Sequence, residues 1–189
     1  MPHPLFTKKS LIALAVFCAA LIVILYLMGR TFLLEGCGLG LWTSSPNSHC
    51  TSQMFADPYS SSHFLHGIIF FFFLWFAFRK MPLEWKFVWA AIIEIAWEIL
   101  ENSSFIINRY RTATSSNDYF GDSIYNSCAD LLFCMLGFYI AAKVPWKVSL
   151  AILVAIELIM LATIKDNLAL NVLMLVYPVE AIKNWQMGL

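Results

Sequence analysis

The sequence has few charged residues and no excess of either sign. Only 13% of its 189 residues are charged, whereas 60% are hydrophobic, and the formal net charge is zero. A soluble domain of this length could not bury so much apolar surface in one core. A neutral chain also lacks the basic surface that nucleic acid requires. The composition therefore indicates an integral membrane protein with no nucleic-acid partner.

A cleavage site of the A-x-A type is also absent after the first apolar run, which is too long for a signal peptide. We interpret that run as an uncleaved membrane anchor. Further apolar runs approach the roughly 20 residues that cross a bilayer. They predict an all-α, polytopic membrane helical bundle of about five transmembrane helices, formed by one integral membrane domain over residues 1–189. The expected spans are residues 11–29, 63–80, 87–107, 123–142 and 148–164.

The last apolar stretch, Val172 to Val176, is too short to cross a bilayer. Pro178 follows it and interrupts any helix there, and Trp185 is suited to the membrane interface. This pattern predicts a short C-terminal helix that is re-entrant or interfacial.

The basic residues predict the orientation of the bundle. With the N-terminus in the cytoplasm, more Lys and Arg residues flank the cytoplasmic ends of the spans than the outer ends. This orientation puts the polar segment 35–62 outside, together with its Cys37 and Cys50. Two cysteines in an outer loop suggest a disulfide, and two unrelated thiols are the alternative.

Ionisable residues recur near the outer ends of three spans. Because an α-helix rises about 1.5 Å per residue, these residues share one layer in the outer half of the bilayer. Ionisable side chains are costly in a membrane and are usually kept for function. We therefore expect one shared site, whose candidate catalytic residues are His63, His66, Glu98, Glu101, Asp122 and Asp130.

Three interpretations of this layer stay open. Its histidines and carboxylates could bind a divalent metal such as zinc, manganese or iron, although H-x-x-H is not the zinc-protease spacing. Paired acids in a low-dielectric pocket could instead act as general acid and general base. The layer could also be a structural hydrogen-bond network. The cofactor is therefore unknown, and all six residues are candidate metal ligands.

Other polar residues near the outer face are candidates for substrate contacts. Arg109 and Arg111 could hold a phosphate or carboxylate head group, or could simply meet lipid phosphates. For Asn167 and Asn171, helix capping is the alternative to substrate binding. The full set is Arg109, Arg111, Asp118, Asn126, Asn167 and Asn171.

Several motifs in this sequence resemble an uncharacterised family of bacterial polytopic inner-membrane proteins. They are Ser62-His63-x-x-His66-Gly67, Glu94-x-x-x-Glu98-x-x-Glu101-Asn102, Arg109-Tyr110-Arg111, Asp118-Tyr119-x-Gly121-Asp122-Ser123-x-x-Asn126-Ser127-x-x-Asp130 and Asp166-Asn167-Leu168-x-Leu170-Asn171. The order H…E-x-x-E…G-D…D is distantly similar to VanZ-like membrane proteins. The first resemblance implies a multi-pass protein of the bacterial inner membrane, and the second points toward envelope lipids or cell-wall precursors.

We therefore expect a protein that binds or processes an amphiphilic, phosphate-bearing envelope lipid or precursor, as a membrane-embedded hydrolase or transferase. Its partners would be membrane lipids and a lipid-linked substrate. One alternative is a small proton-coupled transporter, with a relay through Glu94 and Glu157. Another is a structural or assembly protein with a buried polar network.

Overall fold

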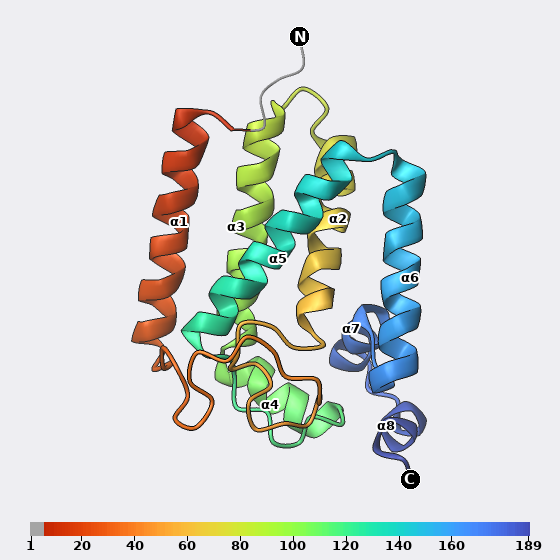
Figure 1. The fold of residues 1–189 in the computed structure, drawn as a ribbon. Coiled ribbons are helices and arrows are strands. Elements are labelled where there is room, and N and C mark those ends of the chain that lie inside the picture. The colour runs from red at the N-terminus through yellow and green to blue at the C-terminus, as the bar shows by residue number, and fades with distance from the viewer. Residues whose placement is uncertain (1–5) are drawn as a thin grey trace.

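The computed structural model describes residues 6–189, and this part of the chain is helical with no strand, as the sequence predicts. Five long helices stand side by side, and three short ones gather at one end of the bundle (Figure 1). In chain order they are α1 Lys8–Leu27, α2 Ser60–Ala77, α3 Leu83–Glu101, α4 Ser104–Ala113, α5 Ile124–Lys143, α6 Trp146–Ile164, α7 Leu168–Val176 and α8 Glu180–Met187.

Four of the long helices, α1, α2, α5 and α6, are long and apolar enough to cross a membrane. Large apolar side chains such as Val16 and Leu27 on α1, and Leu158 and Ile159 on α6, face outward, which suits contact with lipid. The fifth long helix, α3, contains five ionisable residues and is less apolar. It nevertheless lies within the bundle beside α1 and α5 (Figure 1). These apolar helices suggest a membrane protein.

Helices α2 and α5 approach each other closely at two glycines. A Cβ atom added to Gly67 would lie 1.9 Å from the carbonyl oxygen of Cys134, and one added to Gly137 would lie 2.0 Å from that of Phe64. Small residues allow this kind of backbone approach between membrane helices. Gly67 lies one turn beyond His63 on α2, so the same contact brings the polar end of α2 against α5.

The predicted third span differs from the structure. Residues 87–107 do not form one helix, because α3 ends at Glu101 and α4 begins at Ser104. The Ser103 hydroxyl accepts a hydrogen bond from the Ile106 backbone N–H and so caps α4. Helix α4 then crosses the end of the bundle (Figure 1) and includes Arg109 and Arg111.

The C-terminal segment also differs from the prediction of one short helix. It contains two helices, α7 and α8, which are separated at Pro178. Proline has no backbone N–H and disfavours helical geometry in the residue before it, which explains this break. Both helices lie at the same end of the bundle as α4 (Figure 1).

The segment between α1 and α2 covers this end of the bundle. A disulfide joins Cys37 to Cys50, with 5.5 Å between their Cα atoms. The Gln53 amide donates to the Gly121 carbonyl, and the Ser123 backbone N–H donates to the Ser52 carbonyl. The segment is thereby tied to the polar stretch that leads into α5, and the two together form a lid over the helix ends.

Candidate functional site

A cavity of about 980 Å³ opens beneath this lid. One part of its wall is apolar and comes from the long helices α2, α3 and α6, with Phe70, Trp97 and Ile164 among its residues. The other part is polar and comes from the lid and the helix ends. Five of the six predicted catalytic residues lie on the wall, namely His63, His66, Glu101, Asp122 and Asp130.

Glu94 lies at the centre of the polar layer, behind the cavity wall. It is 0% exposed, and its carboxylate contacts both histidines of α2. Its Oε1 lies 2.6 Å from Nδ1 of His63, and its Oε2 lies 3.0 Å from Nδ1 of His66. With each Nδ1 carrying the proton that Glu94 accepts, the Nε2 atoms of both rings remain free for other partners.

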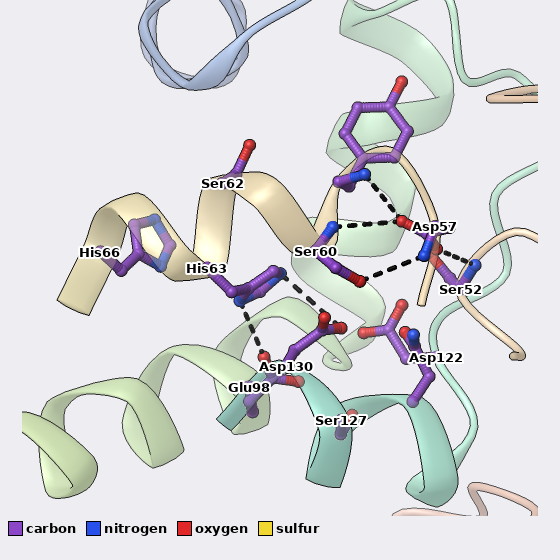
Figure 2. A network of polar contacts seen from close by, with 12 residues as sticks. Ser52, Asp57, Ser60, Ser62, His63, His66, Glu98, Asp122, Ser127 and Asp130 are labelled. Carbon is purple, nitrogen blue, oxygen red and sulfur yellow. Dashed lines mark hydrogen bonds and ion pairs between the residues drawn. The ribbon is translucent and has the colours of Figure 1, made fainter. Parts of the chain in front are cut away.

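Glu98 and Asp130 also surround His63, but they are poorly hydrogen-bonded. Figure 2 shows the three side chains turned toward one another from α3, α5 and α2. Oε1 of Glu98 lies 3.3 Å from Nδ1 of His63, and Oδ2 of Asp130 lies 3.8 Å from its Nε2. Both oxygens of Glu98 and Oδ1 of Asp130 are buried without a hydrogen-bond partner. Buried unpartnered carboxylate oxygens are uncommon, and these three oxygens are available to a further ligand or to protons.

Asp122 lies beside this group and is fully hydrogen-bonded. It accepts hydrogen bonds from the Asn102 amide at 2.8 Å and the Tyr119 hydroxyl at 3.0 Å. Burial raises the pKa of Asp122, and these two hydrogen bonds oppose the rise. Burial also raises the pKa of Tyr119 and of Tyr110, which keeps both phenols protonated as donors.

The two predicted head-group arginines lie away from the cavity wall. Arg109 donates from Nε to the Leu175 carbonyl at 2.8 Å and from Nη2 to the Val176 carbonyl at 3.3 Å. These are carbonyls in the last turn of α7, where a cation is stabilising. Arg111 donates to the Tyr119 carbonyl. Arg109 therefore connects α4 to α7, and Arg111 connects α4 to the polar stretch that leads into α5.

Among the other predicted substrate contacts, the structure places two on the cavity wall and two elsewhere. Asn171 lies on the wall, where it accepts a hydrogen bond from the Tyr110 hydroxyl at 3.0 Å, and Asp118 lies at the exposed rim. Asn126 is buried and donates to the Met54 carbonyl at 2.8 Å, so it holds the lid to α5. Asn167 caps α7 by accepting from the Leu170 backbone N–H.

Comparison with known proteins places the chain in a family. A family described as "Protein of unknown function (DUF2585)" matches residues 25–188, which include all six predicted catalytic residues. The chain belongs to this family.

Relatives of this DUF2585 protein come from several bacteria. It is 48% identical over 169 residues to "UPF0314 protein Atu8092" of Agrobacterium fabrum. The aligned region covers 89% of this chain and 85% of the relative. It is 40% identical over 190 residues to a UPF0314 protein of Paracoccus denitrificans, covering 100% and 98%. A UPF0314 protein of Brucella anthropi is 47% identical over 165 residues, covering 87% and 84%. No solved structure matches the chain.

Sequence reasoning missed the central position of Glu94 in this DUF2585 protein. Glu94 precedes Glu98 by one helical turn, and this spacing was the signal that both face the same side of α3. Glu157, the other residue of the expected relay, is not among the residues that line the cavity. Glu157 accepts hydrogen bonds from the Leu168 and Ala169 backbone N–H groups and so caps the start of α7.

Proposed function

We propose that the protein binds and processes an amphiphilic, phosphate-bearing envelope lipid or lipid-linked precursor at the outer face of the bacterial inner membrane, as a hydrolase or transferase. In this proposal it is a multi-pass protein of one domain with its N-terminus in the cytoplasm. The shape and chemistry of the cavity carry the proposal. An apolar wall built by membrane-type helices leads to a layer of imidazoles and carboxylates.

The two halves of the cavity suit the two halves of an amphiphile. Phe70, Trp97 and Leu168 would line the path of an acyl or prenyl chain, and their burial against it would supply the hydrophobic part of the binding energy. The hydroxyls and amides of Ser115, Ser116 and Asn117 line the polar part, where the head group would lie. The distant likeness to VanZ-like proteins points to the same class of envelope substrate.

The residues on the wall can move protons during such a reaction. Asp130 and His66 both face the cavity. A carboxylate there can accept the proton of an attacking water or alcohol, and an imidazolium can donate one to the leaving group. Because proton transfer of this kind typically contributes 10²- to 10⁴-fold in rate, losing Asp130 should be severe.

Two variants of the full chain, purified in detergent, test the proposal. Ala96 lies on the cavity wall, so Ala96→Trp should obstruct the cavity and reduce co-purification of phosphate-bearing lipid, as measured by mass spectrometry of extracts. Ala151→Trp on α6 is the matched control, because Ala151 is exposed on the outside of the bundle. Asp130→Asn should retain lipid but lose at least ~100-fold in turnover of long-chain phosphomonoesters or pyrophosphates.

Opposite results would contradict the proposal. If wild type and Ala96→Trp carry the same lipids, the cavity is not the binding site. If Asp130→Asn fails to fold while Glu180→Gln on α8 folds normally, the polar layer is a structural network. Circular dichroism and size-exclusion chromatography in detergent separate that outcome from a loss of activity in a folded protein.

A further inference from the structure

The geometry points to a divalent-cation site formed by His63, Glu98 and Glu101, with its open side on the cavity. One ligand atom from each of these residues lies within 4.8 Å of the others. This inference rests on the proposed function, because it assigns to the cation the task of receiving a phosphate group in the same cavity.

Glu98 is the residue that most strongly indicates a missing ligand. It is 0% exposed, and neither of its carboxylate oxygens has a hydrogen-bond partner. Oε2 of Glu101, one turn later on α3, is also buried and unpartnered. A buried carboxylate without donors is costly, and a cation bound to these oxygens would satisfy them.

A second grouping of possible ligands, His63, His66 and Glu94, is less suitable for a cation. The oxygens of Glu94 already lie at hydrogen-bond distance from the Nδ1 atoms of the two histidines. A carboxylate that accepts the Nδ1–H of a ligating histidine is the usual support behind a metal ligand, since it fixes the tautomer and the ring orientation. Glu94 is therefore a positioning residue that accepts from Nδ1 of His63. The ring would then ligate through Nε2, which lies 3.8 Å from Oδ2 of Asp130, on the side of the ring that faces the cavity residues.

The charge balance of the layer supports a cation. Five carboxylates, those of Glu94, Glu98, Glu101, Asp122 and Asp130, lie around two imidazoles. Within residues 6–189, none of the five forms an ion pair with Lys or Arg, since their only ion-pair partners are His63 and His66. Negative charges gathered in a low-dielectric region repel one another, and a divalent cation reduces that repulsion.

The cation would also explain how an acidic cavity receives a phosphate. No Lys or Arg occurs among the described residues that line the cavity, whereas Asp57, Glu101, Asp118, Asp122 and Asp130 do. A bare phosphate would be repelled by this wall. A cation with three protein ligands keeps open coordination positions, which a phosphate oxygen or a water can occupy. Histidine with carboxylates suits zinc, manganese or iron.

Binding of Mn²⁺ to the full-length protein tests this site without any substrate. The detergent-purified protein, stripped with EDTA and dialysed, is titrated with Mn²⁺, and free Mn²⁺ is followed by electron paramagnetic resonance. We expect one saturable site in the wild type. Glu98→Gln and Glu101→Gln should each weaken it by at least ~100-fold, and Glu94→Gln by ~10- to 100-fold. Glu180→Gln, which removes an exposed carboxylate on α8, should bind like the wild type.

Folding is monitored by thermal unfolding of each metal-free variant. Glutamine keeps the shape of glutamate but removes a charge from the cluster, so Glu98→Gln should unfold at the same temperature as the metal-free wild type or higher. The inference is wrong if the wild type shows no saturable site for Mn²⁺ or Zn²⁺, or if Glu98→Gln and Glu101→Gln both bind like the wild type. Lipid co-purification in the presence of EDTA distinguishes a failure of the cation site from a failure of the proposed function. If the protein binds no metal but still retains lipid, the cation site alone is overturned.

Discussion

At the scale of single residues, the carboxylates of the polar layer differ in their surroundings. Glu94 contacts two histidines, Asp122 is held by Asn102 and Tyr119, and Glu98 has no hydrogen bond at all. A carboxylate that already has donors is fixed in place, whereas one without donors is available to a cation or a proton. These surroundings separate the supporting residues from the ones that we expect to act.

The carboxyl group of Asp166, between α6 and α7, should make stability depend on pH. Burial raises its pKa from 3.8 to about 6. The folded state therefore binds this proton more tightly than the unfolded state does. The stabilisation is fully present below pH 3.8 and is lost as the pH rises through about 6. Over this window we expect the unfolding free energy to fall by up to about 3 kcal/mol.

Thermal unfolding in detergent between pH 3.5 and 7.5 measures this effect, with Asp166→Asn as the comparison. Asparagine does not titrate. The unfolding temperature of the wild type should therefore fall relative to that of Asp166→Asn as the pH rises. Other carboxylates titrate in both proteins and cancel in the difference. A difference that stays constant across this window would contradict the assignment to Asp166.

At the scale of helices, the contact between α2 and α5 holds the two sides of the site together. Gly67 and Gly137 allow the backbones to meet, and His63 and Asp130 lie toward the lid on the same two helices. A one-turn slide or a separation of these helices would move imidazole and carboxylate apart. The close packing is therefore a requirement of the site as well as of the fold.

Gly67→Ala should disturb both the fold and the site. The new Cβ would lie 1.9 Å from the Cys134 carbonyl oxygen, and backbone cannot move aside as a flexible side chain can. Overpacking of this kind typically costs about 1–3 kcal/mol. We expect a lower unfolding temperature and weaker Mn²⁺ binding. Ala155→Leu on the exposed side of α6 adds more volume without a clash and should change neither; a wild-type result for Gly67→Ala would contradict the close contact.

The apolar runs were sufficient to predict the long helices, because length and hydropathy decide whether a segment can cross a bilayer. The break after Glu101 was not predictable in this way. It depends on Asn102 binding Asp122, which lies 20 residues away, and on Ser103 capping α4. Arg109 likewise finds its partners on α7, 66 residues along the chain. Partners at such separations leave no periodic signal in a single sequence.

At the scale of the whole molecule, the disulfide, the lid and the cavity lie at one end of the bundle, and the N-terminal end of α1 lies at the other (Figure 1). A disulfide persists in the bacterial periplasm and is rare in the cytoplasm. The excess of basic residues favours a cytoplasmic location for the opposite end. Two independent physical criteria, redox environment and charge, therefore support the same orientation.

Cysteine accessibility in spheroplasts tests this orientation directly. Cys18, Cys128 and Cys134 are free thiols, and in a background where they are replaced by alanine a single new cysteine reports its own side of the membrane. Asn117→Cys, at the exposed rim of the cavity, should react with a membrane-impermeant maleimide in intact spheroplasts. Lys80→Cys, exposed between α2 and α3 at the other end, should react only after the membrane is permeabilised. The reverse pattern would put the cavity in the cytoplasm, where neither the Cys37–Cys50 disulfide nor an outer-leaflet substrate is expected.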